Sequence, residues 1–479
     1  MADSSIRNWE AVIGLEIHVQ LQTQTKMFSS CKWNYGESPN TLTCPLTMAY
    51  PGSLPTINKK AVDSAIMIGN ALKCKINKYS EFSRKHYFYP DLPKGYQISQ
   101  FDKPICGKGN LKVEVNKRFC DIGITRAHLE EDAGKLIHTI DGESLVDYNR
   151  AGAPLIEIVT EPDFRDVDVV IAFLKLLKNT IEYINVSDCD MEKGNLRVDL
   201  NVSLMKKGSS EFGVRREIKN LNSFKSISRA IKYEINEQSR ILDLGGEIKQ
   251  STMIWDEINN KSTILREKED AHDYRYFPEP DLLPLILSNI QVESISDNMP
   301  ELPMDKKARF KKVYSINSED ANFLIADKNV ANYFEELVDL SKDCSQSLNW
   351  IRTHVTQVLN KDKISILDFK IKPNRLSELI YNINNNNITN ENAKKVFEVM
   401  LKDDRAPNEL INDLGLKVSR NINELSLIVE KIMNENNDEF IRLKNGETKL
   451  VKFFIGQVMK ETKGKYPPPM IIKEINGNI

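Results

Sequence analysis

The sequence has no long apolar run, no secretion or transit signal and no cysteine framework. Its hydrophobic stretches fall short of the roughly 20 residues that a membrane-spanning helix needs, so we expect no membrane association. The first residues, MADSSIRNWEAV, lack an apolar core and do not form an Arg-rich amphipathic segment. Seven cysteines, an odd number, are scattered along the chain, which is typical of reduced thiols and favours a cytoplasmic protein.

Several standard site motifs are absent as well. The sequence contains no G-x-x-x-x-G-K-[ST] loop and no G-x-S-x-G elbow, so any use of ATP must rely on another arrangement. Cys31 and Cys44 lack the doubled Cys-x-x-Cys spacing of a structural zinc site, and we predict that the chain binds no zinc. The formal net charge of −2 excludes an overall basic field, so contact with RNA would need local patches.

The chain of 479 residues is too long for one ordinary domain. Residues 1–292 hold most of the glycines, prolines and alternating segments, and we predict a large α+β domain with a mainly antiparallel sheet. After a linker around Pro300, helical patterns alone continue, which predicts a helical domain over residues 293–405. A break at residues 403–408 separates a small helical tail domain, residues 406–479.

The most regular pattern in the sequence is the stretch VIGLEIHVQLQ, residues 12–22. Apolar residues occupy every second position, which predicts a strand with one buried face and one solvent-facing polar face. Glu16 and His18 lie two residues apart and therefore project in the same direction. Oxygen and nitrogen donors on one strand are half of a divalent metal site. The alternative is an ordinary solvated strand face.

A second alternating stretch, NLRVDLNVSL, covers residues 195–204. Its polar face carries Arg197 and Asp199. If the two strands share a sheet, Asp199 can converge with Glu16 and His18 on one polar floor. The planar guanidinium of Arg197 could then hold a phosphate group.

Further acids and bases occur on other predicted strands. Glu130 and Glu131 are adjacent in TRAHLEEDAGK, so only one of them can join a shared face. Glu157 interrupts an apolar strand, where an unpaired carboxylate is costly to bury and a metal or arginine partner is expected. The remaining candidates are Arg150 in a small-residue turn, and Glu217 and Lys219 on one side of a short strand. Together these residues suggest an oxygen-rich Mg²⁺ site for phosphoryl transfer.

Two basic segments are candidates for RNA contact. Residues 81–100 interleave cations with aromatic rings, on which the bases of single-stranded RNA can stack. An aromatic mini-core under a loop is the alternative. Three lysines at the end of a C-terminal helix are either solvated or in contact with phosphates. The predicted RNA-binding residues are Lys85, His86, Tyr87, Tyr89, Lys94, Tyr96, Lys460, Lys463 and Lys465.

Seven segments in order along the chain resemble a known family. VIGLEIHVQL, AYPGSLPTIN, HYFYPDLPKGYQISQ, HLEEDAGK, DYNRAGAPLIEIVTEPD, EIKNLNSF and REKEDAHDYRYFPEPDL are similar to the signature segments of the B subunit of aspartyl/glutamyl-tRNA amidotransferases. The tail segment VKFFIGQVMKETKGK resembles the C-terminal module of the same family, although the ending GKYPPP departs from it.

The resemblance implies a heterotrimer in a bacterial cytoplasm. A glutaminase subunit supplies ammonia, and a small third subunit ties the glutaminase to the B subunit. The B subunit receives ATP and mischarged Glu-tRNA(Gln) or Asp-tRNA(Asn). It phosphorylates the side-chain carboxylate, and ammonia displaces the phosphate. The resemblance further implies a cradle-shaped catalytic domain and helical domains that grip the tRNA. Some members hold zinc through four cysteines, but this chain keeps only Cys31 and Cys44.

The residues and the resemblance together assign the site. The resemblance matches the metal-binding positions to Glu16, His18 and the acids of HLEEDAGK, Glu130 or Glu131, with Asp199 and Glu217 as further candidates. Two other functions stay open, an ATP-dependent metalloenzyme acting on a free acid and a non-catalytic tRNA-binding protein. We expect catalytic roles for Glu16, His18, Glu131, Glu157, Arg197 and Asp199, ATP binding by Arg150, Glu217 and Lys219, and Mg²⁺ binding by Glu16, His18, Glu130, Glu131 and Asp199.

Overall fold

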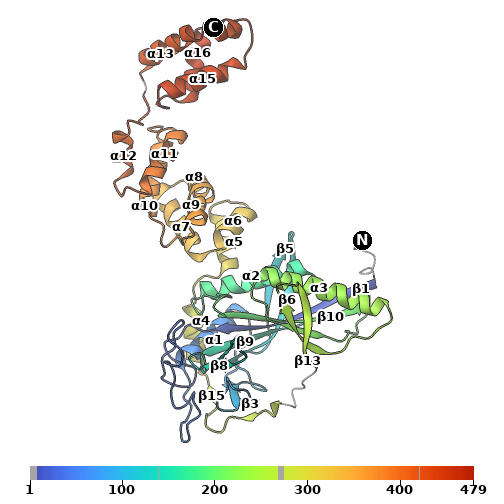
Figure 1. Ribbon diagram of the computed structural model, residues 1–479. Helices are drawn as coiled ribbons and strands as arrows, with labels where there is room; N and C mark the ends of the chain where they lie inside the picture. The colour runs from blue at the N-terminus through green and yellow to red at the C-terminus, as the bar shows by residue number, and fades with distance from the viewer. Residues whose placement is uncertain (1–7, 140, 268–273, 420) are drawn as a thin grey trace. The chain divides into compact units, whose positions relative to one another are not determined.

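The computed structural model describes residues 8–139, 141–267, 274–419 and 421–479 (Figure 1). The chain divides into two compact units, residues 1–306 and 307–479. The predicted α+β class with a helical C-terminal region is confirmed. Within the described ranges, every helix is too short or too polar to cross a bilayer. Part of the segment REKEDAHDYRYFPEPDL, residues 268–273, lies outside the described residues.

An eight-stranded sheet forms the centre of the first unit. β1 lies in the middle of it, hydrogen-bonded to β10 on one side and to β9 on the other. All neighbouring strands are antiparallel except β11 and β12, so the predicted mainly antiparallel sheet is confirmed. In spatial order the strands are β13 (Lys261–Glu267), β12 (Ser251–Asp256), β11 (Arg216–Lys219), β10 (Leu196–Lys206), β1 (Trp9–Gln20), β9 (Pro154–Thr160), β6 (Arg118–Glu131) and β5 (Gly109–Val115).

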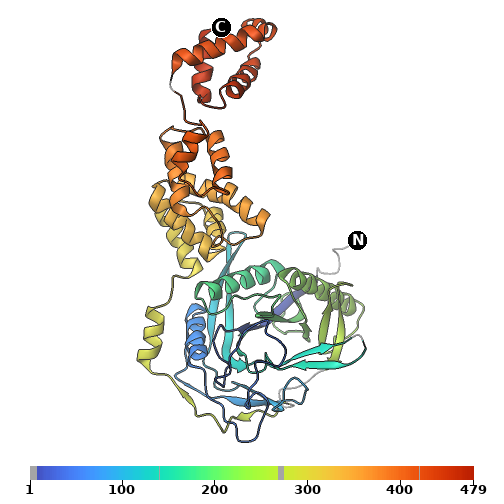
Figure 2. The ribbon, with the colours of Figure 1, turned by 60° about the vertical axis from the view of Figure 1, so that its left-hand side comes forward.

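Three helices cover the apolar side of this sheet. α2 (Val167–Tyr183) and α3 (Phe224–Asp243) lie side by side along one face in both views (Figure 1, Figure 2), and α1 (Lys59–Ala71) packs on β6 and β9. The alternating apolar residues of β1 and β10 are buried against them, as the strand pattern predicts. Asp166 and Ser223 cap the starts of α2 and α3 through their side chains.

Short sheets and hairpins pack around the polar side. The segment of residues 81–100 carries two strands, β3 (Ser83–His86) and β4 (Tyr96–Ser99), which form a small sheet with β14 (Phe277–Pro278). β4 contacts β6. The other short strands form two pairs, β2 (Tyr79–Ser80) with β15 (Leu285–Ile286) and β7 (Lys135–His138) with β8 (Ser144–Asp147).

The first unit extends beyond the predicted boundary at residue 292. α4 (Asn289–Asp297) packs on α1, and Val292, Ile295 and Met299 contribute to the core of the first unit. The compact unit therefore ends at Lys306 rather than at residue 292. The linker prolines mark a change of composition, but packing decides which unit a helix joins.

The second unit is helical throughout its described residues and contains two hydrophobic cores. The first of these runs from Phe310 to Leu416 and includes α12, which packs on α10 and α11, so the core ends after the predicted boundary at residue 405. The tail core begins at Leu425. The elements are α5 (Pro303–Val313), α6 (Ser318–Ile325), α7 (Lys328–Ser341), α8 (Cys344–Trp350), the π-helix η3 (Ile351–Val355), α9 (Thr356–Asp362), α10 (Pro373–Asn384), α11 (Asn390–Met400), α12 (Pro407–Asp413), α13 (Ile422–Glu435), α14 (Asn437–Lys444), α15 (Leu450–Glu461) and α16 (Pro468–Gly477).

Candidate active site

The strand register brings polar residues from four neighbouring strands into one row. In β1 and β10, Glu16 lies opposite Asp199 and His18 lies opposite Arg197. On the other side of β1, Glu157 of β9 lies opposite His18. The next strand, β6, places His128 opposite Glu157. The two alternating stretches are therefore adjacent in one sheet.

Four of these side chains, with Glu130 of β6, form what we call the carboxylate–histidine cluster: Glu16, His18, His128, Glu130 and Glu157. The Nε2 atom of His18 lies 3.4 Å from carboxylate oxygens of both Glu130 and Glu157, and 3.7 Å from Glu16. The Nε2 atom of His128 lies 3.6 Å from Glu157 and 3.9 Å from Glu130.

The prediction that this strand face is open to solvent holds only in part, since the side chain of Glu16 is 31% exposed. The side chains of Glu130 and Glu157 are only 2% and 6% exposed, and that of His18 is 18% exposed. The strands packed around the polar side of the sheet supply the cover, since the Ser99 hydroxyl of β4 donates a hydrogen bond of 3.3 Å to Glu130. The alternation of apolar and polar residues along a strand assigns each residue to one face of the sheet. Whether that face is exposed to water depends on what packs against it.

The close packing of the acids shifts the pKa values in the cluster. Burial raises the pKa of Glu16 to about 7, and the charge of Glu157 adds to the shift. Burial alone would lower the pKa of His18, but the surrounding carboxylates raise it to about 9. Burial lowers the pKa of His128 to about 4, which keeps this imidazole neutral. The cluster thus holds three carboxyl groups around the imidazole of His18.

The donor atoms fit a hard divalent cation. Ligand atoms of Glu16, His18 and Glu157 lie within 4.8 Å of one another, and so do those of His128, Glu130 and Glu157. Carboxylate oxygens with imidazole nitrogen suit Mg²⁺ or Mn²⁺, whose charge would offset the repulsion between the acids. Within the described residues, the buried Nδ1 atom of His128 has no hydrogen-bond partner, so this imidazole is not fully held by the protein.

Two groups of ion pairs involve β10 residues that lie opposite the cluster residues of β1. Lys219 lies 2.6 Å from Asp199 and 2.8 Å from Glu217, so the side chain of Asp199 is paired with Lys219 rather than with His18. Arg197, two residues before Asp199 on β10, forms an ion pair of 2.8 Å with the buried Asp132. Arg150 lies 3.5 Å from the same Asp132 and donates hydrogen bonds to the backbone oxygens of residues 133 and 134.

Glu130 joins the cluster, whereas the structure does not bring Glu131 to it. The carboxylate of Glu131 forms a buried ion pair with Lys94 and accepts a hydrogen bond of 3.0 Å from the backbone amide of Ile98. The expectation that Glu131 binds the metal with His18 is therefore corrected, because adjacent strand residues project to opposite faces. Lys94, expected to contact RNA, is likewise occupied by this pair.

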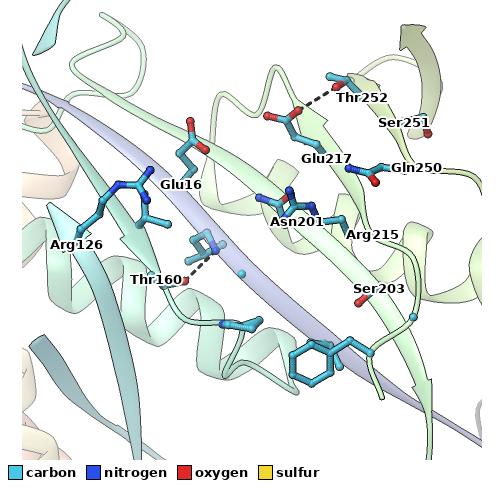
Figure 3. A pocket seen from close by; sticks show the side chains of 17 residues that line it. Glu16, Arg126, Thr160, Asn201, Ser203, Arg215, Glu217, Gln250, Ser251 and Thr252 are labelled. Carbon is cyan, nitrogen blue, oxygen red and sulfur yellow. Dashed lines mark hydrogen bonds between the residues drawn. The ribbon is translucent and has the colours of Figure 1, made fainter. Parts of the chain in front are cut away.

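Two cavities open beside the polar row. One has a volume of about 530 Å³ and lies next to Glu16. Figure 3 shows Glu16 rising from β1 between Arg126 of β6 and Glu217 of β11. The other cavity, of about 550 Å³, is lined by Arg150, Arg197 and Asp199 and by the loop of residues 33–37. Both are large enough for a small ligand and carry guanidinium groups suited to anions.

Family comparison decides what this arrangement belongs to. Residues 11–293 match the model of the GatB/GatE catalytic domain, and residues 332–479 match that of the GatB domain. The chain belongs to the GatB family. The resemblance inferred from the seven segments is confirmed.

Three relatives illustrate how far this GatB family similarity extends. Proteins of Persephonella marina and Caldicellulosiruptor bescii are each 46% identical over 97% of this chain, covering 98% and 97% of the relative. A protein of Chlorobium chlorochromatii is 43% identical over 98% of the chain and spans 100% of that relative. All three are named as the B subunit of an aspartyl/glutamyl-tRNA(Asn/Gln) amidotransferase.

The strand β3 divides the predicted RNA-binding residues of the GatB catalytic domain between two environments. Lys85 faces the cluster: although burial opposes its charge, the phenol of Tyr276 and the buried carboxylates raise the pKa of Lys85. His86 faces away, stacked on Phe277 at 4.9 Å and tilted against Tyr96 at 5.9 Å. His86 and Tyr96 therefore belong to the aromatic mini-core that was the alternative.

The other predicted RNA contacts differ in exposure. Burial raises the pKa of the Tyr87 phenol, and the charge of Asp91 adds to the shift. Tyr89, in contrast, is 55% exposed. In the tail, Lys460 and Lys463 are exposed at the end of α15 and Lys465 is half-buried.

Sequence reasoning missed two residues of the GatB site. His128 precedes Glu130 by two positions, so strand alternation alone places both on one face. Arg126, two positions earlier, lines the first cavity and lies 3.8 Å from Glu157. The signal was the same period of two that identified Glu16 and His18, extended back along β6.

Proposed function

We propose that this chain uses ATP and Mg²⁺ to phosphorylate the side-chain carboxylate of Glu-tRNA(Gln) or Asp-tRNA(Asn). Ammonia then displaces the phosphate and gives Gln-tRNA(Gln) or Asn-tRNA(Asn). The observation that carries the proposal is the buried carboxylate–histidine cluster, which lies beside a cavity lined by arginines. Burying several carboxyl groups this close together costs free energy unless a cation offsets their charge.

The chemistry explains why both features are needed. A carboxylate is a poor electrophile because its anionic oxygens repel nucleophiles and oxide does not leave. Transfer of a phosphoryl group to one oxygen creates a leaving group, and the C–O bond then breaks as ammonia adds. Glu16, His18, Glu130 and Glu157 would hold Mg²⁺, which neutralises phosphate charge when bound. The protein contributes mainly by positioning and by charge.

Arginines on both sides of the cluster have unused donors for a phosphate. The Nε atoms of Arg126 and Arg197 are buried and have no hydrogen-bond partner within the described part of the chain. Arg126 lines the cavity next to Glu16, and Arg197 lines the second cavity. An anionic ligand that accepted these hydrogen bonds would satisfy both groups, so we assign them to phosphate binding.

The assembly we propose is a heterotrimer in the bacterial cytoplasm. A glutaminase subunit supplies ammonia, and a small third subunit links the glutaminase to this chain. The helical region binds the tRNA through local lysines, because the chain as a whole carries a formal net charge of only −2.

Release of ADP by the assembled complex tests the function. Glutamine is omitted, and ATP is supplied with mischarged tRNA, with uncharged tRNA, or with free glutamate or aspartate. We expect ADP release with a mischarged tRNA alone, with the label of [γ-³²P]ATP passing to the aminoacyl group. Release with a free acid would instead favour a metalloenzyme acting on small acids. If the assembled complex still releases ADP when the cluster residues of this chain are replaced, the chain is a non-catalytic tRNA-binding protein.

A further inference from the structure

Lys26 is a fully buried lysine that the proposed chemistry does not use. Its side chain has no exposed surface, and it is among the largest fully buried side chains of the described residues. Within the described part of the chain its ammonium forms no ion pair, and its hydrogen bond goes to the backbone oxygen of Tyr148, at 3.4 Å. A buried ammonium without an anion is unfavourable, so its surroundings must supply negative charge.

Two thiols are candidates for that charge. Burial lowers the pKa of Lys26, and the groups that most oppose this shift are Cys31 and Cys44. The backbone of Lys26 donates a hydrogen bond of 2.9 Å to the backbone oxygen of Cys31. Both thiols are partly exposed, so small reagents can reach them.

The hydroxyl of Ser29 connects the two cysteines. The backbone amide of Cys31 donates to this hydroxyl at 3.4 Å, and the sulfur of Cys44 lies 3.5 Å from it. The sulfur of Cys44 also lies 3.5 Å from the hydroxyl of Thr47. Cys31 and Cys44 therefore form a compact group with Lys26 and two hydroxyls, and the thiol of Cys44 adds to the raised pKa of Cys31.

The two thiols are not equivalent. Although burial works in the opposite direction, hydrogen bonds from Ser29, Thr47 and the backbone of Leu46 hold the pKa of Cys44 below its ordinary value. Burial raises the pKa of Cys31 above its ordinary value, although Lys26 opposes the shift. A thiolate is the reactive form of cysteine, so Cys44 has the character of a nucleophile and Cys31 that of its partner thiol.

We propose that Cys31 and Cys44 form a peroxide-reactive dithiol, in which Cys44 is the attacking thiolate and Cys31 resolves the product to a disulfide. The Cys44 sulfur attacks hydrogen peroxide, an S–O bond forms, the O–O bond breaks, and hydroxide takes up a proton as water. The Cys31 sulfur then attacks the sulfenic acid of Cys44, the S–O bond breaks, and the Cys31 proton leaves with the oxygen as a second water. Two thiols and one peroxide thus give one disulfide and two waters.

The disulfide would close the loop that forms one wall of the second cavity. Trp33, Tyr35 and Glu37 lie between the two cysteines in sequence and line this cavity. The loop is already held by Asn149, which donates a hydrogen bond of 2.7 Å to the backbone of Ser38 and accepts one of 2.7 Å from that of Leu42. Oxidation would therefore restrict the wall of a cavity that also contains Arg197.

Mass spectrometry of the full-length chain treated with hydrogen peroxide tests the proposal. Of the seven cysteines, we expect Cys31 and Cys44 to be consumed first and to appear as one disulfide-linked peptide pair that dithiothreitol reverses. In Cys31→Ser, dimedone should label Cys44 as a sulfenic acid. In Cys44→Ser, dimedone should not label Cys31. Oxidation of Cys120 or Cys344 before Cys44 would overturn the proposal.

The rate of thiol alkylation supplies a second test within one protein. Burial raises the pKa of the partly exposed Cys344, so this thiol is an internal control. We expect iodoacetamide to modify Cys44 with a pH midpoint below that of Cys344. A midpoint at or above that of Cys344 would contradict the assignment of Cys44 as nucleophile. Neither assay involves ATP or tRNA, so both are independent of the proposed function.

Replacement of Lys26 tests the role of the buried charge. Lys26→Met should slow alkylation of Cys44 at pH 7 by up to about tenfold, the effect of one pKa unit, whereas Lys26→Arg should retain the wild-type rate. Equal rates in folded Lys26→Met and wild-type protein would show that the ammonium does not activate the thiol. Where Lys26→Met does not fold, the wild-type pH profile still decides the reactivity of Cys44.

Discussion

Glu130 and Glu131 are neighbours in sequence with different partners. Glu130 lies in the carboxylate–histidine cluster beside His18, whereas Glu131 is paired with Lys94 on the opposite side of β6. Both are buried, so exposure does not distinguish them. The distinction predicts that Glu130 serves chemistry and Glu131 serves stability, and the two roles can be measured separately.

Removing the imidazole of His18 should abolish carboxylate phosphorylation. His18→Ala and Glu16→Ala each remove a donor from the cluster and leave the remaining carboxylates to repel one another. The measurement is acyl phosphate formation and glutamine hydrolysis by the assembled complex. We expect the first to be lost and the second to persist at least in part.

Glu143→Gln is the matched control for these variants, since Glu143 is an exposed acid in the turn between β7 and β8. It should leave both reactions unchanged. Transamidation at the wild-type rate by His18→Ala and Glu16→Ala would show that the cluster is not the catalytic metal site.

Replacing Glu131 should destabilise the protein without a specific loss of chemistry. Glu131→Gln leaves the buried ammonium of Lys94 unpaired, which costs about 3–5 kcal/mol for a buried pair. Urea unfolding of the first unit measures the loss. Lys94→Met combined with Glu131→Gln should recover part of it, because both charges are then gone. A stable Glu131→Gln protein that cannot phosphorylate its substrate would place Glu131 in catalysis instead.

Among the helices, α1 is tied to the rest of the structure through its N-cap. The side chain of Asn58 accepts a hydrogen bond from the amide of Ala61 and donates to the backbone oxygens of Thr25 and Lys26. Ser223, which caps α3, satisfies the single amide of Ser226 in the usual way. The two N-caps therefore differ: Asn58 also holds a neighbouring segment, whereas Ser223 bonds only within its own helix.

This difference predicts unequal effects of removing the two caps. Ser223→Ala should cost about 1 kcal/mol, the usual value for an N-cap. Asn58→Ala should cost about 2 kcal/mol or more, because it also removes the side-chain donor to the backbone oxygen of Lys26, whereas that of Thr25 keeps the hydroxyl of Thr23. Urea denaturation with peptide-resolved hydrogen exchange reports both. Equal costs would mean that water replaces the lost donor of Asn58.

At the scale of the whole molecule, the three cores decide where the chain can be cut. A cut at the predicted boundary after residue 405 would remove Leu410, Ile411 and Leu416 from the second core. A cut after Lys417 leaves that core intact and removes the tail core, which begins at Leu425. A truncation that removes only the tail core should therefore begin at residue 418 rather than at residue 406.

Removing residues 418–479 should weaken tRNA binding and spare the chemistry. The loss of Lys460, Lys463 and Lys465 removes cations that can bind phosphates, so the KM for mischarged tRNA should rise while kcat changes less. The slope of the salt dependence of binding should fall by about one for each phosphate that is no longer bound. A tRNA titration of transamidation at several salt concentrations measures both. A folded, assembled truncation whose kcat collapses at unchanged KM would place the tail in catalysis.

The triple substitution of these lysines by glutamine is the finer version of the experiment. It keeps the tail and should reproduce most of the rise in KM. Lys452→Gln, at an exposed position earlier on α15, is the matched control and should have little effect. If the control weakens binding as much as the triple variant, the tRNA interaction is a diffuse one spread over the helix.

Elemental analysis should find no zinc in the purified chain. Cys31 and Cys44 supply only two of the four ligands that a structural site needs. About one zinc per chain would overturn this prediction and would also compete with the proposed dithiol.

Local patterns determined much of this protein. The period of two placed Glu16 and His18 on one face of β1 and the apolar residues on the other, because the strand backbone alternates whatever surrounds it. Helix caps at Asp166 and Ser223 were equally readable, since a cap satisfies amides of its own helix. Each of the family segments is a contiguous stretch of sequence, so the amidotransferase family could be assigned from the sequence by itself.

The tertiary structure decided what depends on residues far apart in the chain. Register placed Glu157 opposite His18 and His128 opposite Glu157, and packing covered most of a polar face that the pattern left open to solvent. Partner choice, such as Lys219 for Asp199 and Lys94 for Glu131, follows from which strands and loops meet. Alternation specifies a direction for each side chain, but distance, burial and charge pairing are properties of the assembled sheet, because they arise only when distant segments pack together.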